Sequence, residues 1–469
     1  MTTDKSEATR IECDTMGKME VPAEALWGAS TQRAVLNFPI SDVTIDPGII
    51  HAYGLIKWAA ARANRKLGTV DSEKADLIEK ASKEVFKGEL DRHFVVDVFQ
   101  TGSGTSTNMN ANEVIANRCS QLAGTEIGSK TPVHPNDHVN QSQSSNDTFP
   151  SALHIAIAQA LHKDLLPALQ EVRNSLGAKA NEFHDVLKIG RTHLMDATPL
   201  RLGQEFGGYA RQLDLAMERV NKALEAIFEL PLGGTAVGTG LNCHADFPKL
   251  AIALIAEKTG LNFVEAENHF EAQAAKDGLV EVSGQLKTIA VSLFKIANDL
   301  RWLNSGPRCG IGEISLPETQ PGSSIMPGKV NPVISEAMMQ VCAQVIGNDT
   351  AVTWGGANGN FELNVMMPMI GQNLLNSIKL LTNASTSLAT RCLDGITANE
   401  EHCAELVEWS MSMVTSLAPI IGYETAAKIA KRSVEEKKTV REVCMEMEIL
   451  PLDELEKALD PAAMTESRG

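Results

Sequence analysis

Apolar residues recur at alternating spacings of three and four along two segments of the chain, residues 206–227 and 279–303. This spacing places apolar side chains along one side of an α-helix, so each segment predicts a long helix with a heptad seam. At 1.5 Å per residue the helices would be roughly 35–45 Å long, which suits a helical bundle. The seams consist of Phe206, Ala210, Leu213, Met217, Val220, Leu224 and Ile227, and of Leu279, Val282, Leu286, Ile289, Leu293, Ile296, Leu300 and Leu303.

The pattern also predicts helices over residues 152–183, 333–349 and 363–388. Aromatic residues make up only 4% of the 469 residues, while small and aliphatic residues are abundant, which favours helix-on-helix packing. A chain of this length exceeds what one hydrophobic core usually serves. We therefore expect an all-α fold with three domains: residues 1–140, a central long-helix bundle over 141–398, and a small helical domain over 399–469.

Five polar, glycine-rich segments interrupt the helical pattern, and function is expected there because loops carry most binding and catalytic groups. They are Thr101–Asn108, His134–Asp147, Gly190–Ala197, Gly233–Gly240 and Pro321–Pro332. The segment Gly233–Gly240 lacks the Gly-Lys-Ser/Thr ending of a phosphate-binding loop, so nucleotide binding is not expected there.

The segment Pro321–Pro332 reads PGSSIMPGKVNP. Its prolines and glycines exclude an interior helix, while Asn331-Pro332 resembles the cap and first position of a helix that follows. A helix N-terminus together with Lys329 and Asn331 suits an oxyanion, and Ser323 and Ser324 lie on the same loop. The alternative is a surface connection with a solvated lysine.

Two further clusters combine hydroxyl groups with an expected helix start. Ser144, Ser145 and Asn146 precede one helix, and Ser103, Gly104 and Thr105 form the other cluster, in which glycine permits close backbone approach. Each cluster taken alone is more often a capped helix start than an anion-binding site.

His193 follows Arg191 and Thr192 and precedes Asp196 in the third polar segment, so it is the one histidine that has other reactive-type residues beside it in the sequence. Glu336, expected in the first helical turn after Pro332, is a candidate for orienting His193 if the fold brings them together. His134 and His138 are four residues apart, but Pro135 and Asn136 disfavour a helix and no third ligand is adjacent, so a metal site is not expected.

The formal net charge of −17 argues against nucleic acid and anionic membranes as partners. No run approaches eighteen apolar residues, so no membrane span is expected. The first seventeen residues contain no apolar segment of the kind found in secretory signals, which favours the cytoplasm. The eight cysteines are scattered without a CxxC pair, as expected for free thiols in a reducing compartment and not for a zinc or iron–sulfur site.

The stretch GSSIMPGKVNP resembles the signature loop of the fumarase/aspartase superfamily. The stretches LWGASTQRAVLNF, GSGTSTNMNANEV, HPNDHVNQSQSSND, GRTHLMDATPLRLGQE, GGTAVGTGLN, VCAQVIGND and GNFELNV are similar to those of class II fumarases, nearly from end to end. The aspartases have glutamine at the position of His193, so the chain is identified as a member of the class II fumarase family.

The resemblance implies a homotetramer in which the central helices of four chains form a twenty-helix core and three chains build each active site. It implies reversible, metal-independent hydration of fumarate to (S)-malate through an aci-carboxylate intermediate, without a cofactor, in the tricarboxylic acid cycle. Two alternatives stay open: another lyase of the superfamily, such as an aspartase, and a catalytically silent structural member.

Carried over by motif, the catalytic residues would be Ser323, His193 with its partner Glu336, and Lys329. Substrate contacts would come from Ser103, Gly104, Thr105, Ser144, Ser145, Asn146, Thr192, Ser324, Lys329 and Asn331. A second dicarboxylate site would consist of His134, Asn136 and Asp137. Thr131 replaces an arginine often found beside that second site, and Met195 stands where many relatives have glutamine.

Overall fold

The computed structural model describes residues 8–467, so the first seven residues of the N-terminal stretch discussed above lie outside the described part. The chain divides into two compact units. Unit 1 comprises residues up to Pro167 together with Glu218–Thr288 and Ala343–Leu381, and unit 2 comprises the remainder. The boundaries between the units fall within long helices, because both units contain residues of α7, α10, α11 and α12.

Unit 1 is mainly helical, and the N-terminal part of the chain supplies most of its elements. Its helices and helical turns are α1 (Ala29–Asn37), α2 (Pro47–Leu67), α3 (Ser72–Phe86), η1 (Asp91–His93), α4 (Thr105–Ala123), η2 (Pro135–Val139), α5 (Ser145–Ala160), η3 (Leu161–Leu165), α8 (Phe247–Thr259) and α9 (His269–Ala274). Its short strands form the pairs β1 (Thr9–Asp14) with β2 (Gly17–Pro22), β5 (Glu229–Leu230) with β6 (Val264–Glu265), and β8 (Gly359–Asn360) with β9 (Leu363–Asn364).

Helix α2 is the central buried element of unit 1. Asp46 caps its start by accepting a hydrogen bond from the Gly48 amide, Pro47 occupies the first turn, and Gly68 ends it at φ 73°. Most of its side chains are buried, among them Lys57 at 0% exposure. The helix packs against α3, α4 and α5, and the two expected hydroxyl clusters lie at the starts of α4 and α5.

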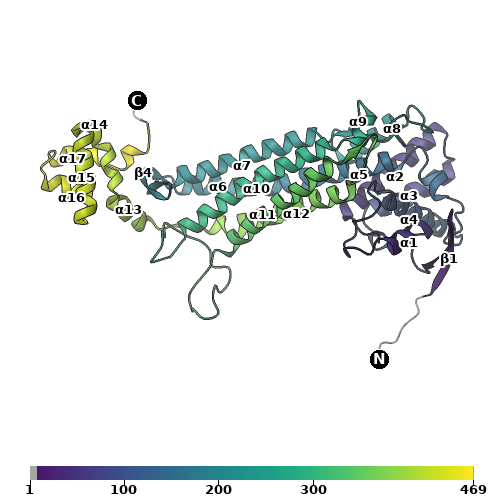
Figure 1. Ribbon diagram of the computed structural model, residues 1–469, viewed down its shortest axis with the longest axis horizontal. Helices are drawn as coiled ribbons and strands as arrows, with labels where there is room; N and C mark the ends of the chain where they lie inside the picture. Colours follow the sequence, from purple (N-terminus) through teal and green to yellow (C-terminus); the bar gives the residue numbers. More distant parts are fainter. Residues whose placement is uncertain (1–7, 468–469) are drawn as a thin grey trace. The chain divides into compact units, whose positions relative to one another are not determined.

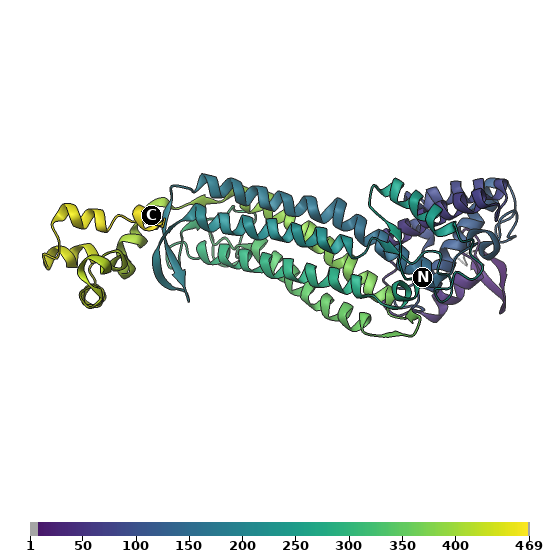
Figure 2. The same ribbon diagram turned by 90° about the horizontal axis from the view of Figure 1, so that it is seen from above.

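Unit 2 contains segments of the long helices α6 (Leu166–Glu182), α7 (Leu202–Glu225), α10 (Asp277–Leu303), α11 (Val333–Gly356) and α12 (Met367–Arg391), which run side by side (Figures 1 and 2). Its strands pair β3 (Leu187–Thr192) with β4 (Met195–Arg201), and β7 (Ile314–Ser315) with β10 (Thr397–Ala398). The C-terminal elements are η4 (Leu393–Gly395), α13 (Glu400–Trp409), η5 (Met411–Ser416), α14 (Ala418–Ile421), α15 (Tyr423–Glu436), α16 (Val440–Glu446), α17 (Leu452–Ala458) and η6 (Ala462–Met464).

Both predicted heptad seams face a core. All eight seam positions of residues 279–303 are at most 5% exposed. In the seam of residues 206–227, Met217 is only half-buried, whereas its neighbour Ala216 is buried, so the apolar stripe shifts by one residue there. Polar contacts also join the bundle helices within unit 2: Tyr209 of α7 donates to Asp299 of α10 at 2.9 Å.

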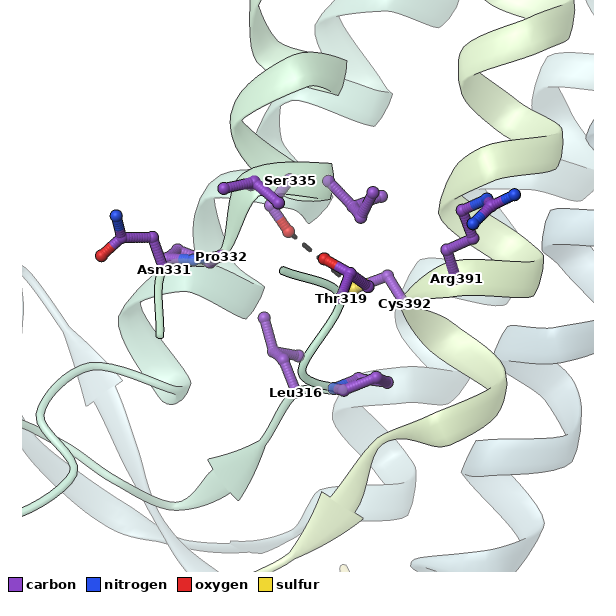
Figure 3. A pocket seen from close by; sticks show the side chains of 10 residues that line it. Leu316, Thr319, Asn331, Pro332, Ser335, Arg391 and Cys392 are labelled. Atoms are coloured by element: carbon purple, nitrogen blue, oxygen red, sulfur yellow. Dashed lines mark hydrogen bonds between the residues drawn. The ribbon is translucent and has the colours of Figure 1, made fainter. Parts of the chain in front are cut away.

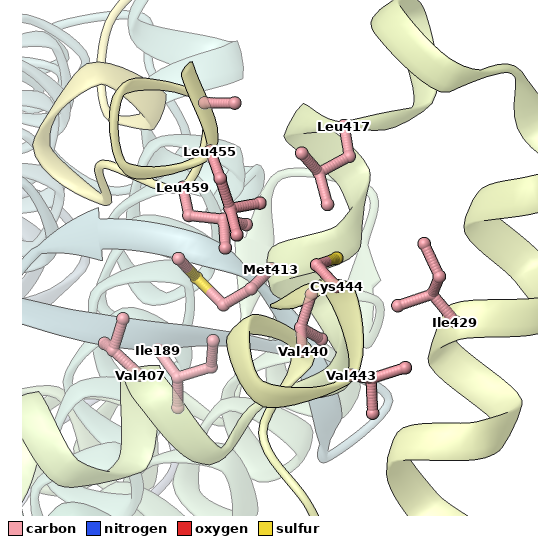
Figure 4. Close-up of a cluster of buried hydrophobic side chains, with 11 residues drawn as sticks. Ile189, Val407, Met413, Leu417, Ile429, Val440, Val443, Cys444, Leu455 and Leu459 are labelled. Atoms are coloured by element: carbon pink, nitrogen blue, oxygen red, sulfur yellow. The ribbon is translucent and has the colours of Figure 1, made fainter. Parts of the chain in front are cut away.

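The C-terminal helices enclose a small apolar core (Figure 4), which includes Leu417, Ile429, Val443 and Leu455. Ile189 of β3 belongs to the same cluster and is 1% exposed. The strand that leads toward His193 is therefore packed into this core.

Three local predictions need correction. The segment after His134 was expected not to be helical, yet Pro135–Val139 forms one π-helical turn, because a proline is tolerated in a first turn and the His134 ring accepts bonds from two backbone amides. The helix expected from residue 363 begins at Met367, since Leu363 and Asn364 pair in a short strand. The helix expected over 152–183 begins earlier, at Ser145, and contains the π-helical turn η3.

None of the helices within residues 8–467 is long and apolar enough to cross a membrane. All eight cysteines are free thiols as predicted, five of them buried. The division into three domains at residues 140 and 398 stays a prediction.

Candidate active site

The loop before α11 holds Ser323 in a backbone turn. Its Oγ accepts hydrogen bonds from the amides of Ile325 at 3.3 Å and Met326 at 3.0 Å, and the side chain is half-buried. Amide donors stabilise an oxygen that carries negative charge, which lowers the cost of deprotonating a hydroxyl group. The neighbouring Ser324 is exposed.

Lys329 and Asn331 close the same loop. The Lys329 ammonium donates to Asn331 Oδ1 at 2.6 Å, and Asn331 Nδ2 donates to the Gly322 carbonyl at 2.7 Å. A Cβ atom on Gly322 would lie 2.2 Å from the Lys329 carbonyl oxygen, so this closure requires glycine. Residues 318–323 and 326–330, among them Ser323 and Lys329 but not Ser324, line a cavity of about 420 Å³, a size suited to a small molecule.

The loop leads into a helix as predicted, with a shift of one residue. Helix α11 begins at Val333, and the Pro332 carbonyl accepts the first helical bond from the Glu336 amide at 3.1 Å, so Pro332 and not Asn331 occupies the cap position. A second cavity beside this turn, lined by Asn331, Ser335 and Cys392, measures only about 10 Å³ (Figure 3). It is too small for a substrate.

His193 lies at the tip of the β3–β4 hairpin, where sequence reasoning expected only a polar loop. Thr192 pairs with Met195, and the two residues of the turn, His193 and Leu194, have φ values of 56° and 60°. This left-handed conformation is typical of a tight hairpin turn but is strained for a leucine. The tip presents Thr192 and His193 to solvent.

Buried charges anchor the base of this hairpin. Glu313, which is 0% exposed, accepts from Arg191 at 2.9 Å and pairs with Lys188 at 3.3 Å. A register shift between Ile189 and Arg191 allows both cations to face one carboxylate, although an odd spacing would otherwise place them on opposite faces of the strand. Sequence reasoning missed this cluster, because no local pattern indicates that these distant residues meet.

Glu336 lies half-buried in the first turn of α11 as predicted. Among residues 8–467, no hydrogen bond or ion pair joins Glu336 to His193 within the chain. The pairing of these two residues stays a prediction.

In unit 1 the two hydroxyl clusters meet. Thr105 Oγ1 lies 2.7 Å from Ser103 Oγ and 2.7 Å from Ser145 Oγ, which forms a chain of three hydroxyl groups across the starts of α4 and α5. Ser144 caps α5 by accepting from the Asn146 amide at 3.2 Å. We call this arrangement of Ser103, Gly104, Thr105, Ser144, Ser145 and Asn146 the cradle. Two helix N-termini beside one hydroxyl chain favour an anion.

Close packing requires glycine at the start of α4. Gly104 has φ 73°, and a Cβ atom there would lie 2.0 Å from the Phe149 ring. Glycine has no side chain that could cap the helix, so the first backbone amides of α4 donate to no side chain at this position.

Asp147, which sequence reasoning did not single out, ties the cradle to the Gly233–Gly240 segment. Its carboxylate accepts from the amides of Ser144 at 2.9 Å, Gly233 at 2.9 Å and Thr235 at 3.0 Å. Burial raises the pKa of Asp147 to about 6, against the opposing effect of these amides. The position after Ser144-Ser145-Asn146 was the available signal, because an acidic residue there completes a capping box.

The residues of the expected second site lie on and beside η2. The His134 ring accepts from the amides of Asn136 and Asp137 at 3.3 and 3.2 Å, and Asp137 is exposed. His134 and Asn136 line a cavity of about 330 Å³ that is also lined by Lys130. No group of three or more metal-ligating side chains occurs among the described residues.

The structure thus arranges the predicted residues in local groups. Unit 1 holds the cradle and the His134 region, and unit 2 holds the Ser323 loop with Glu336 and the His193 hairpin. The hydroxyl contacts of the cradle and the Lys329–Asn331 contact lie within these groups.

Comparison with known proteins bears on the whole chain. The family model described as Lyase matches residues 17–347, and the one described as Fumarase C C-terminus matches residues 413–466. A class II fumarate hydratase of Mycobacterium tuberculosis is 55% identical over 463 residues, which cover 98% of this chain and 96% of the relative. The chain belongs to the class II fumarate hydratase family.

Other members of this family are similarly close. The mitochondrial fumarate hydratase of Danio rerio is 53% identical over 461 residues, covering 98% of this chain and 90% of the relative. The crystal structure of a class II fumarase from Schistosoma mansoni matches with a TM-score of 0.95 at 40% identity, covering 97% of this chain and 99% of that one. The similarity spans both units, so the all-α fold of class II fumarases is confirmed.

Proposed function

We propose that this protein catalyses the reversible hydration of fumarate to (S)-malate, without a metal or cofactor, as a class II fumarate hydratase. The observation that carries the proposal is the Ser323 loop, in which two amides hold the serine oxygen and Lys329 lines the same cavity. The curated relatives at 52–55% identity are fumarate hydratases over nearly their full length.

The reaction moves a proton at the carbon next to a carboxylate and so passes through an aci-carboxylate. Ser323 as alkoxide exchanges this carbon proton, because its two amide donors favour the charged oxygen. Lys329 and Asn331 stabilise the negative charge of the intermediate, and Ser324 contacts the substrate. His193, oriented by Glu336, transfers the proton of the hydroxyl group on the opposite face. The cradle and Thr192 bind the substrate carboxylates.

Assembly into a homotetramer is part of the proposal, with a twenty-helix core and active sites built from three chains. The support is helix α11, whose 24 residues include only two charged ones, Glu336 and Asp349. Its exposed residues in unit 1 are uncharged, and Ile346 and Trp354 are 39% and 69% exposed. A face of this kind favours contact with another chain over contact with water.

A second dicarboxylate site at His134, Asn136 and Asp137 is also proposed. Thr131 does not supply the cation that many relatives have there, but Lys130 lines the same cavity and its ammonium donates to the Cys13 carbonyl at 2.8 Å. If the Lys130 ammonium exchanged this backbone contact for a carboxylate of the ligand, it would provide the positive charge of the site. We place the protein in the cytoplasm and in the tricarboxylic acid cycle.

The test of the function follows fumarate by its ultraviolet absorbance after addition of purified protein, with and without ammonium. The proposal expects loss of fumarate without ammonium and (S)-malate as the product. Turnover only with ammonium would identify an aspartase. No turnover under either condition would favour a lyase for larger substrates or a silent structural member.

A further inference from the structure

Lys57 is a fully buried lysine that has no part in the function described above. It lies in the middle of α2 at 0% exposure, and its ammonium donates to Asn108 Oδ1 at 2.9 Å and to Asn140 Oδ1 at 3.0 Å. No ion pair of Lys57 occurs among residues 8–467. A buried charge without a carboxylate partner is costly, so its position calls for a physical reason.

Both partners of Lys57 belong to segments that build the cradle. Asn108 lies one turn into α4, three residues after Thr105, and Asn140 lies four residues before Ser144. Asn140 Oδ1 also accepts from Asn108 and Asn112, at 3.1 and 3.2 Å. One amide oxygen therefore accepts from three donors, beside the segments that build the cradle.

A further contact extends this network to α5. Thr148, in the first turn of α5, donates to Asn108 Oδ1 at 3.3 Å and to the Ser144 carbonyl at 2.8 Å. The Lys57 network thus supports the starts of both helices whose N-termini form the cradle.

The surroundings of Lys57 are poor in negative charge. Asp147 of α5 is the carboxylate whose field acts on it, and the Tyr53 ring of its own helix lies 5.9 Å from the ammonium. α4 and the segment after η2 present the amides of Asn108, Asn112 and Asn140, and Asn112 Oδ1 is buried without a partner. Both adjacent helix starts carry partial positive charge, which disfavours a cation there while the cradle is empty.

From this geometry we propose that Lys57 is a positioning and electrostatic residue of the cradle, which provides a buried positive charge when a dianionic dicarboxylate binds. The proposal rests on the proposed function and names the group that sets the affinity of this site for dianions. A bound dianion supplies the negative charge that the empty cradle lacks, so binding and protonation of Lys57 favour each other.

Linkage then fixes the sign of the pH dependence. Burial lowers the pKa of Lys57 to about 7, so the empty protein holds this lysine largely neutral above that pH. A bound dianion raises the pKa again, and the protein takes up a proton on binding between pH 7 and the new value. Affinity for a dicarboxylate should therefore fall as the pH rises above 7.

The test measures binding of succinate, a saturated dicarboxylate that cannot be hydrated, to the full-length protein by calorimetry. Lys57→Met should raise the dissociation constant at least tenfold at pH 6.5 and flatten its pH dependence between 6.5 and 8. The matched control is Lys276→Met, because Lys276 is also fully buried, at 1% exposure, and burial also lowers its pKa to about 7, but its ammonium donates to the backbone carbonyls of Ala272, Gln273 and Ala275. The control should change the dissociation constant less than twofold.

An unchanged affinity in Lys57→Met, or equal losses in both variants, would overturn the proposal. If Lys57→Met does not fold, calorimetry of the wild type in two buffers of different ionisation enthalpy replaces it. Uptake of a fraction of a proton at pH 7.5, retained in His193→Asn, is expected, and no uptake would contradict the proposal. Fumarate hydration is assayed separately, so succinate binding that depends on Lys57 without hydration would refute only the proposed function.

Discussion

Ser323 and Ser324 are adjacent serines with different surroundings. The Ser323 oxygen receives two backbone amides, whereas the Ser324 side chain is exposed. Because amide donors favour an alkoxide, the structure distinguishes the two hydroxyl groups where their shared motif does not. The assignment of the carbon-side base to Ser323 rests on this difference.

At the residue scale we predict that His193→Asn lowers kcat by about a hundredfold or more, because a positioned general acid or base contributes 10²–10⁴-fold. The plot of rate against pH should lose the side that reports the titration of His193. His184→Asn is the control, since His184 is exposed in the same unit and pairs only with its neighbour Asp185. Steady-state kinetics between pH 6 and 9 measure both variants, and an unchanged profile in His193→Asn would remove that residue from the mechanism.

A second residue-scale prediction concerns Asp147→Ala. Loss of the carboxylate leaves three backbone amides without their acceptor, and those of Gly233 and Thr235 are buried, so the free energy of unfolding should fall by about 3 kcal/mol. Asp46→Ala, which removes a cap that accepts one amide, should cost about 1 kcal/mol. Urea denaturation compares the two, and equal losses would refute the role given to Asp147.

The residues of local motifs were predictable from the sequence, whereas buried partners were not. Ser323, Lys329 and Asn331 lie within one loop whose prolines and glycines exclude regular structure, so their proximity followed from the sequence. Lys57 and Glu313 meet partners more than fifty residues away. Their burial depends on packing between helices, which no local pattern encodes.

At the scale of elements, the β3–β4 hairpin combines a strained tip with a fixed base. The base is held by Glu313 and by Ile189 in the C-terminal core, while the tip residues are exposed. A rigid base with a presented tip is a suitable support for a catalytic histidine, because the strand limits its movement.

We predict that Leu194→Gly raises the free energy of unfolding by about 0.5 kcal/mol. Glycine relieves about 1–2 kcal/mol of left-handed strain and loses part of this gain to the greater entropy of its unfolded chain. Met195→Gly should instead cost about 1 kcal/mol, because glycine within a strand loses more conformational freedom on folding. Met195 is the matched position, since it lies in β4 and is exposed to a similar extent as Leu194. Thermal melting of both variants provides the test, and destabilisation by Leu194→Gly would contradict the assigned strain.

Elements with a strict period were predicted best. The seam of residues 279–303 is buried at every predicted position. The hairpin around His193 was not predicted, because its turn residues, His and Leu, are not those that favour a left-handed turn. The π-helical turn at 135–139 was missed for a related reason, since Pro135 signalled an interruption and the supporting contacts of the His134 ring have no sequence signature.

At the scale of the whole molecule, α11 contains only two charged residues among its 24. Its unit 1 segment exposes Ile346, Gly347 and Trp354 without an exposed charge among the residues of that helix segment. Packing of other chains against this surface would remove it from water, and the burial would stabilise the assembly by about 25 cal/mol for each Å² of apolar area.

We therefore predict that Ile346→Glu lowers the mass of the assembly below four chains and reduces activity with it, because a buried charge without a partner opposes association. Tyr423→Glu, on a helix rich in charged residues and 82% exposed, should leave both unchanged. Light scattering coupled to size exclusion measures the mass. A tetramer in Ile346→Glu, or a monomeric wild type, would contradict the proposed assembly.

The most direct test of the account compares wild type and Ser323→Ala in fumarate hydration at equal protein concentration, without ammonium, and measures in parallel the rise in melting temperature caused by malate. The wild type should convert fumarate to (S)-malate. The variant should retain well under a tenth of this turnover while malate still stabilises it, because the serine acts on the substrate after binding. A variant that keeps a tenth or more of the activity would contradict the role of Ser323 as the base that acts on the carbon proton.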